Sequence, residues 1–260
     1  MLQVIINADD FGLTDGVSRG IVRAIHEGVV TSTTAMACVP GAAERLRHWA
    51  PQIRQRIGAH LQLTTGRPLS HPSLIPTLCR PDGTFHLSKN SLIEASVSEI
   101  LIEWQAQYQF LLDAGIQPTH LDTHHHVHKL SNVFQAFCEF AMRLDIPARA
   151  VTPSNRNSMQ QANIRCPDQM LLGFYGDSLD TQSLLSVVDT STAPHGSIVE
   201  IMCHPGYSCT ALAALSKYTY QRDQELQILC SHALKEQFRT IGIILRSYDA
   251  LSSSAFALPT

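Results

Sequence analysis

The chain has 260 residues, of which 44% are hydrophobic and 16% are charged, and its formal net charge is −3. This length and composition suit one large domain or two small ones, and they exclude a disordered chain, a collagen and a coiled coil. No apolar run approaches the roughly 20 residues that span a bilayer, and the near-neutral charge argues against a dedicated binder of nucleic acid or of a membrane surface.

Short apolar runs alternate with amphipathic segments along the chain. Apolar and β-branched runs predict strands at residues 4–6, 31–38, 57–63, 119–123, 147–151, 197–203 and 241–245. Helical spacing predicts helices at residues 16–28, 41–56 with a break at Pro51, 92–114, 132–144, 179–188 and 220–240. Residues 64–92 and 154–177 are polar or rich in proline, which indicates two long irregular excursions.

The repeated order of strand and helix predicts a parallel sheet that is covered by helices. About seven strands are too many for a small flavodoxin-like sheet. We therefore expect an α/β fold, a distorted or incomplete (β/α) barrel with parallel strands and irregular insertions; an open doubly wound sheet is the alternative. No repeat or linker divides the sequence, so residues 1–260 are expected to form a single domain.

The cysteines and the N-terminal sequence indicate in which cellular compartment the protein is expected. The N-terminal sequence MLQVIINADDFG lacks the basic and long apolar regions of a signal peptide. The seven cysteines are odd in number and no pair has CxxC spacing. We expect reduced cysteines that act as small buried residues, and a cytoplasmic location.

Histidine is the unusual component of the sequence. Five of the 13 histidines lie between His120 and His128. Four polar clusters stand at or near the C-terminal end of a predicted strand: Asp9 with Asp10, His60, residues 122–128, and His204. Active sites of (β/α) barrels and open parallel sheets form at that edge, so the four clusters predict one shared site.

Two or more histidines with a carboxylate are the usual ligands of a divalent metal that keeps open coordination positions. Such a metal activates water and polarises a carbonyl or phosphoryl oxygen, and a second carboxylate could accept the proton of that water. Asp9 and Asp10 would point in opposite directions in an extended strand, so we expect a turn at Phe11–Gly12 to bring both to the site. The alternative for Asp10 is to cap the following helix.

The histidine run is predicted to be extended. His124, His126 and His128 would then share one face and His125 would take the other. One or two of the four are expected to bind a metal, and the others to bind substrate, support the ligands or be structural. His60 and His204 also have a simpler interpretation, as hydrogen-bonded histidines of the core.

Five motifs stand in order along the chain. They are NADDFG at 7–12, VTSTT at 30–34, GAHL at 58–61, PTHLDTHHHVH at 118–128 and MCHP at 202–205. This arrangement resembles the YdjC-like carbohydrate deacetylase family, and most closely its bacterial chitooligosaccharide (chitin disaccharide) deacetylases. The resemblance runs from residue 2 to about Tyr248, and such long ordered motifs are more specific than a single HxH pattern.

The resemblance implies a hydrolase that removes acetyl groups from N-acetylglucosamine units of chitooligosaccharides such as diacetylchitobiose. It implies one divalent metal ion on Asp10, His60 and His124; magnesium is the metal commonly associated with the family, and zinc, manganese, cobalt and nickel also suit the ligands. Asp9 matches the general base and His204 matches the proposed general acid.

Two regions depart from the family pattern. Arg149 falls where a family arginine could orient the base, but in a loosely matching segment, and Leu69–Asn90 is hard to align and is expected to shape the sugar pocket. The expected partner is a small acetylated oligosaccharide, with no nucleic acid and no membrane, and a homodimer is left open.

Two other functions stay open at this stage. A metal-dependent phosphoesterase usually needs two metals or basic clamps, and near the clusters the sequence offers Lys129 and little else that is basic. A non-catalytic sugar- or metal-binding protein would have no need for both Asp9 and His204.

Overall fold

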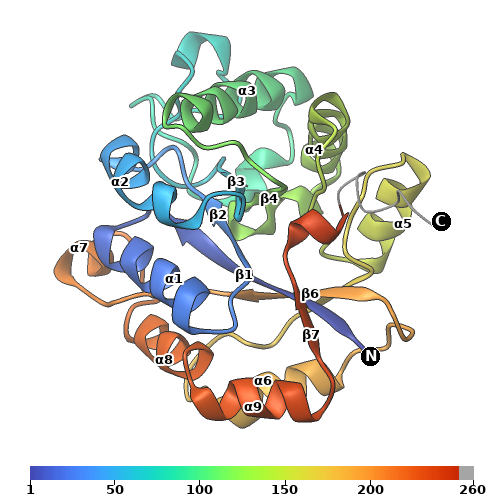
Figure 1. Ribbon diagram of the computed structural model, residues 1–260. Helices are drawn as coiled ribbons and strands as arrows, with labels where there is room; N and C mark the ends of the chain where they lie inside the picture. Colours follow the sequence, from blue (N-terminus) through green and yellow to red (C-terminus); the bar gives the residue numbers. More distant parts are fainter. Residues whose placement is uncertain (252–260) are drawn as a thin grey trace.

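The computed structural model describes residues 1–251, in which seven parallel strands form one curled sheet with helices around it (Figure 1). The strand order is β4-β3-β2-β1-β6-β5, and β7 pairs with the first residues of β1. The strands are β1 (Gln3–Phe11), β2 (Ser32–Ala35), β3 (Ile57–Leu61), β4 (Leu121–Thr123), β5 (Gln169–Leu171), β6 (Ile198–Cys203) and β7 (Ile244–Arg246). The sheet is an incomplete barrel, as predicted, because its edge strands β4 and β5 do not pair with each other.

Helices connect the strands and cover the outside of the sheet. They are α1 (Asp15–Glu27), α2 (Ala42–Trp49), α3 (Val97–Asp113), α4 (Ser131–Leu144), α5 (Pro153–Gln161), α6 (Thr181–Asp189), α7 (Thr210–Ala213), α8 (Tyr220–Leu229) and α9 (His232–Thr240). In Figure 1, α3 and α4 lie together at the top, beyond β3 and β4, whereas α6, α8 and α9 lie at the bottom. None of the described helices is long and apolar enough to cross a membrane.

Strand β1 lies at the centre of the sheet and is almost wholly buried. Val4, Ile5 and Ile6 have no exposed surface, because helices cover one face and the barrel interior covers the other. Helix α1 follows directly, and Thr14 caps it by accepting a hydrogen bond from the backbone N–H of Val17. The alternative role of Asp10 as the cap of this helix is therefore wrong.

The sequence predicted that residues 154–177 are irregular, and this prediction is only partly correct. The segment contains most of α5 and the whole of β5. Thr152 caps α5 and Pro153 takes its first position, which are normal start signals. Helix α5 buries only Met159, so its sequence has no apolar periodicity from which the helix could be predicted.

Two other predicted elements take a different form in the structure. The predicted strand at 147–151 is reduced to a single bridge between Leu121 and Ala148. The predicted helix at 220–240 is two helices, α8 and α9, separated by Cys230 and Ser231. The excursion at 64–92 is mainly irregular, as expected, with two short 3-10 turns, η2 (Pro72–Leu74) and η3 (Lys89–Leu92).

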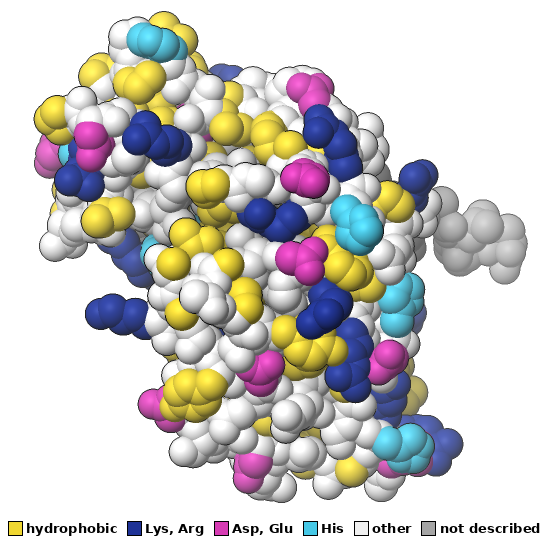
Figure 2. Space-filling view, turned by 90° about the vertical axis from the view of Figure 1, so that its left-hand side faces the viewer, with side chains coloured by type: hydrophobic (Ala, Val, Ile, Leu, Met, Phe, Trp, Pro, Cys, Tyr) yellow, Lys and Arg dark blue, Asp and Glu magenta, His cyan; other side chains and the backbone are white. Residues whose placement is uncertain are grey.

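The surface mixes both signs of charge. On the face in Figure 2, which is the left-hand side of Figure 1, basic and acidic side chains alternate with apolar and uncharged ones. The chain carries 19 Lys and Arg against 22 Asp and Glu, so a mixed surface is the arrangement that this composition favours.

Candidate metal and active site

Asp9 and Asp10 lie in an irregular part of β1. Between two successive pairings β1 contains one residue more than its neighbour β2; the flanking pairs are Ala8 with Thr33 and Phe11 with Ala35. Such a bulge re-aims side chains that would otherwise alternate. Asp10 also has a positive φ of 71°, which non-glycine residues rarely adopt. The bulge at Asp9 and Asp10, rather than the expected turn at Phe11–Gly12, brings both side chains to one site.

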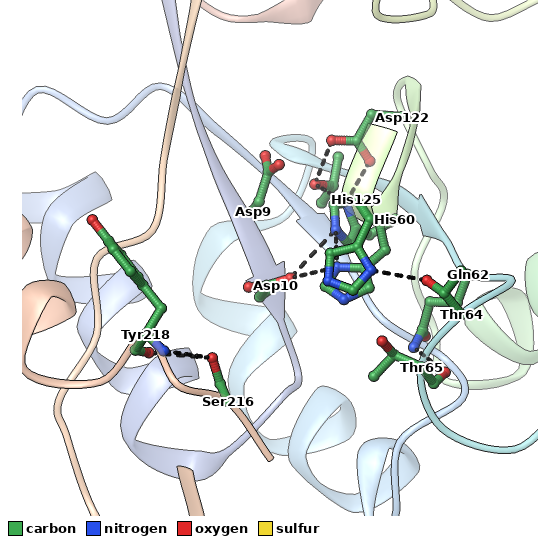
Figure 3. Close-up of polar contacts among 12 residues, drawn as sticks. Asp9, Asp10, His60, Gln62, Thr64, Thr65, Asp122, His125, Ser216 and Tyr218 are labelled. Atoms are coloured by element: carbon green, nitrogen blue, oxygen red, sulfur yellow. Dashed lines mark hydrogen bonds and ion pairs between the residues drawn. The ribbon is translucent and has the colours of Figure 1, made fainter. Parts of the chain in front are cut away.

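Three donor atoms converge beside this bulge (Figure 3). Oδ1 of Asp10 lies 3.3 Å from both His60 Nε2 and His124 Nδ1, and these two nitrogens are 3.1 Å apart. Ligand atoms about 2.1 Å from one cation are about 3.0–3.4 Å apart at octahedral or tetrahedral angles. Oδ1 of Asp10 is buried and has no hydrogen-bond partner among the described residues. The three residues therefore fit a single divalent cation.

The ring of His60 is held from behind. Its Nδ1 lies 2.7 Å from Asp122 Oδ1, and Thr34 donates a hydrogen bond to the other oxygen of Asp122 at 2.9 Å. Histidines that bind metals commonly have such a carboxylate on their second nitrogen. Burial alone would lower the pKa of His60, but Asp122, Asp10 and Asp9 outweigh it and raise the pKa to about 10. The same carboxylates favour any positive charge at this point, including a cation.

Asp9 is oriented by the buried guanidinium of Arg149. Its two oxygens accept hydrogen bonds of 2.7 and 2.8 Å from the two terminal nitrogens of Arg149. Arg149 also lies 2.8 Å from Asp122 and from Glu200. Burial would raise the pKa of Asp9, but the charge and hydrogen bonds of Arg149 outweigh it and lower the pKa. Asp9 is therefore ionised, and its plane is fixed by a bidentate ion pair.

A second group of potential ligands fits a cation less well. Asp9, His60 and Asp122 also have ligand atoms within 4.8 Å of one another. The carboxylate oxygens of this group already accept hydrogen bonds from Arg149 and Thr34. Only the group with Asp10 offers a buried oxygen without a hydrogen-bond partner among the described residues.

The histidine run is not extended, so that prediction is wrong. Residues 124–129 form the 3-10 turn η4, in which His125 and His126 have positive φ values of 59° and 51°. The chain has to turn here from β4 into α4, which begins at Ser131. The ring of His125 therefore lies beside that of His124, with centroids 3.8 Å apart, and its Nδ1 is 2.9 Å from Thr64 Oγ1.

His126 and His128 do not belong to either group of potential metal ligands among the described residues. His128 is buried, its Nδ1 is 2.6 Å from Thr123 Oγ1, and its ring stacks on Phe137 at 4.6 Å. Burial lowers the pKa of His128 to about 3 and that of His126 to about 2. These contacts support a structural role for His128.

His204 follows β6 and is close enough to the site for Asp10, Arg222 and Asp9 to influence its pKa. Its backbone N–H donates to Glu225, and its ring makes edge contacts with Tyr175 and Tyr218 at 5.4 and 5.7 Å. Its Nδ1 is buried and has no hydrogen-bond partner within the described residues, as is also true of Nδ1 of His126 and Nε2 of His128. Burial lowers the pKa of His204 to about 4, so its ring is neutral near pH 7.

Sequence reasoning missed several charged residues around the site. Arg222 of α8 donates a 2.6 Å hydrogen bond to Oδ2 of Asp10. Glu225, one turn later, is buried beside His204, and Glu200 is buried in the middle of β6. A signal was present in the sequence, because these charged residues occupy positions where the helical or strand pattern calls for apolar side chains.

A pocket of about 280 Å³ opens at two of the three potential ligands, Asp10 and His124; His60 is not among the residues that line it. Asp10 and His124 line one part of it, and Tyr175 and Tyr218 line another. The two tyrosine rings are stacked 4.3 Å apart and Tyr175 is 54% exposed, so a flat aromatic face borders the pocket. Thr65 is the contribution of the excursion, and no residue of 69–90 lines the pocket, contrary to expectation. A larger cavity of about 530 Å³, beside α5 and β5, contains none of these site residues.

The fold and the site together define the class of the protein. An incomplete parallel (β/α) barrel occurs with a TM-score of 0.53 in the Xyl-CE4 domain of a xylanase from the hindgut metagenome of Trinervitermes trinervoides, at only 9% identity, with 99% of this chain and 92% of that one covered. The family described as YdjC-like protein matches residues 3–240. The chain belongs to this YdjC-like family.

Named relatives cover almost the whole chain. A carbohydrate deacetylase of Geobacillus stearothermophilus is 37% identical over 246 residues, which are 94% of this chain and 96% of that protein. A chitooligosaccharide deacetylase of Yersinia enterocolitica is 35% identical over 256 residues, or 95% and 98% of the two chains. A crystal structure named for cellobiose-phosphate cleavage, from Enterococcus faecalis, has a TM-score of 0.87 at 34% identity and covers 96% and 98%.

Proposed function

We propose that this protein is a metal-dependent carbohydrate N-deacetylase that acts on N-acetylglucosamine units of chitooligosaccharides such as diacetylchitobiose. The observation that carries the proposal is the convergence of ligand atoms of Asp10, His60 and His124 at the edge of a pocket that Asp10 and His124 line, with the ionised Asp9 next to Asp10 in the bulge of β1. The substrate class comes from the names of the relatives, which are carbohydrate deacetylase and chitooligosaccharide deacetylase.

Asp10, His60 and His124 would hold one divalent cation, which when bound polarises the acetyl carbonyl and lowers the pKa of water. The resemblance favours magnesium. Two imidazole nitrogens and one carboxylate oxygen are a more usual set for zinc, manganese, cobalt or nickel, since magnesium prefers oxygen ligands. Reloading the metal-stripped protein with each of these ions in turn tests which one restores activity.

Asp9 is the proposed general base. Its carboxylate is ionised and fixed in plane by Arg149, so it can accept the proton of the water that attacks the acetyl carbon. Oδ1 also accepts a 2.9 Å hydrogen bond from Nδ2 of Asn7, so Oδ2, which accepts a hydrogen bond from Arg149, is the oxygen that keeps a lone pair for this role.

His204 is the proposed general acid. The departing group of an amide leaves as an amine only if its nitrogen receives a proton. The free ring of His204 is neutral near pH 7, so it must gain the proton that it later donates, and its open Nδ1 provides a place for one. An aromatic wall of Tyr175 and Tyr218 beside it offers an apolar face to a sugar ring.

A phosphoesterase is the alternative enzyme. The expectation that little besides Lys129 is basic near the site is wrong, because Arg149 and Arg222 both reach it. Each guanidinium is paired with a carboxylate, but Nη1 of Arg222 has no hydrogen-bond partner among the described residues, and Arg222 and Lys217 both line the pocket. The preference for an acetyl group over a phosphate therefore rests on the named relatives, which are deacetylases.

The decisive experiment compares two products. Release of acetate from N,N′-diacetylchitobiose is measured beside release of phosphate from p-nitrophenyl phosphate, with and without a chelator. We expect acetate release that the chelator removes and added metal restores. Phosphate release alone would support the phosphoesterase, and metal binding without either product would support a binding protein.

A further inference from the structure

We propose that Arg222 is a positioning residue that orients the carboxylate of Asp10 for the cation. This inference rests on the proposed metal site. Among the site residues Arg222 donates a side-chain hydrogen bond to Asp10, from a helix that follows Asp10 by more than two hundred positions in the chain.

The two oxygens of Asp10 have different surroundings. Oδ2 accepts a 2.6 Å hydrogen bond from Nη2 of Arg222. Oδ1 is left facing His60 and His124, at 3.3 Å from each. The ion pair therefore makes the two oxygens inequivalent and selects which of them meets the histidines.

Asp10 needs an external restraint because its backbone is unusual. It lies in the bulge of β1 with a φ of 71°, a conformation that persists only where the surroundings impose it. Arg222 is 2% exposed and is itself fixed, since its Nε donates a 3.0 Å hydrogen bond to the backbone oxygen of Tyr218. The fixed guanidinium of Arg222 thus restrains the carboxylate of Asp10, whose backbone conformation is strained.

Stability alone gives a poor reason for this ion pair. Buried ion pairs can often be replaced by apolar residues without loss of stability, because removing both charges from water is costly. Leu226 and Leu229 lie buried on the same helix, so an apolar residue would suit this face of α8. The charge of Arg222 contacts Asp10, a candidate metal ligand, so we infer that Arg222 serves to orient that ligand.

Two effects of removing Arg222 oppose each other. Loss of its positive charge would strengthen the attraction of the site for a cation, whereas loss of orientation would weaken binding. Residues that hold metal ligands typically contribute about 10- to 100-fold to affinity or activity. We therefore expect orientation to outweigh charge.

The test measures binding of Zn²⁺ alone to the metal-stripped, full-length protein by titration calorimetry. Arg222→Met should raise the Kd by about 10- to 100-fold, and Arg222→Lys, which keeps the charge and one hydrogen bond, should recover part of that loss. The matched control is Arg23→Met on α1, whose arginine is exposed and paired with Glu27; its Kd should equal that of the unmodified protein. Thermal unfolding of the metal-free variants shows whether each is folded.

An unchanged or lower Kd in folded Arg222→Met overturns the proposal. If Arg222→Met does not fold, Arg222→Lys decides. Lysine keeps the charge but lacks the Nε that fixes the guanidinium on the backbone of Tyr218, so a Kd equal to that of the unmodified protein contradicts the need for a fixed guanidinium. The proposed function fails separately, when the unmodified protein binds Zn²⁺ but releases no acetate from diacetylchitobiose with any metal. The acetate measurement uses only the unmodified protein, so its outcome is independent of the Arg222 variants.

Discussion

The groups that face the pocket and the groups that support them are built differently. Asp10, His60 and His124 come from β1, β3 and η4, in the first half of the chain, and they meet at an atom without a hydrogen-bond partner among the described residues. Arg149 and Arg222 come from the second half and are paired with carboxylates. Arg149 does not line the pocket, whereas Arg222 both pairs with Asp10 and lines the pocket. The unfilled acceptor marks where a cation can bind, and the paired charges form a frame that holds the site residues in place.

The supporting frame is an extended network. Arg149 is surrounded by Asp9, Asp122 and Glu200, and Glu200 also accepts a 2.7 Å hydrogen bond from the hydroxyl of Tyr248. Three carboxylates around one buried guanidinium would repel each other without it. We therefore expect substitutions of pocket-facing residues to change binding and turnover, loss of Arg149 to change stability, and loss of Arg222 to act through Asp10 on metal affinity.

The largest effect is expected within the histidine run. His124→Ala should abolish metal binding, because it removes one of three ligands, whereas His125→Ala should leave metal content unchanged and affect stability slightly. Metal content after dialysis, measured by atomic emission, checks both variants. Equal loss of metal in the two variants would show that His125 is a ligand as well as His124.

Asp9→Asn tests the other carboxylate of the bulge. The variant should keep its metal and lose about 10²- to 10⁴-fold in kcat, because it removes a base and spares the ligands. Acetate release and metal content are measured on the same sample. A loss of metal as large as that of Asp10→Ala would contradict the division of labour between the two aspartates.

Arg149→Met tests the frame. It leaves three buried carboxylates without their cation and should lower the free energy of unfolding by about 3–5 kcal/mol. Urea unfolding checks this value, with the exposed Arg23→Met expected within about 0.5 kcal/mol of the unmodified protein. A loss in Arg149→Met as small as that of this control would show that the network does not support the fold.

His204→Ala separates an acid from a core histidine. Metal content should stay intact, and turnover of the amide substrate should fall about a hundredfold. Turnover of p-nitrophenyl acetate should fall much less, because its leaving group departs without protonation. Equal losses on the amide and the ester would assign His204 to the core and remove it from the proposed mechanism.

The smallest effect concerns His128, which belongs to the frame although it stands in the histidine run. Its pKa is lowered to about 3 by burial, so below the usual value of about 6.5 the unfolded chain binds a proton that the folded chain does not. This residue should therefore reduce stability by up to about 1.4 kcal/mol for each pH unit below 6.5. His128→Phe should lose that dependence, as urea unfolding at about pH 7, 6 and 5 would show; parallel curves would contradict it.

Much of the site follows from the sequence by itself. Asp9, Asp10, His60, Asp122 and His204 lie at the C-terminal end of a parallel strand, and in a curled sheet those ends meet at one edge. The parallel incomplete barrel follows from the alternation of apolar runs and amphipathic helices. These features depend on periodicity and on strand ends, both of which are local in the chain.

Tertiary structure alone decided how these residues are aimed. The bulge in β1 depends on pairing with β2, and the turn at 124–129 depends on the position of α4 relative to β4. Arg149 and Arg222 meet their aspartates across 140 and 212 positions of the chain, respectively. A sequence pattern reports on neighbours within a few residues, whereas an ion pair between distant residues exists only when packing of the whole sheet and its helices brings the two charges together.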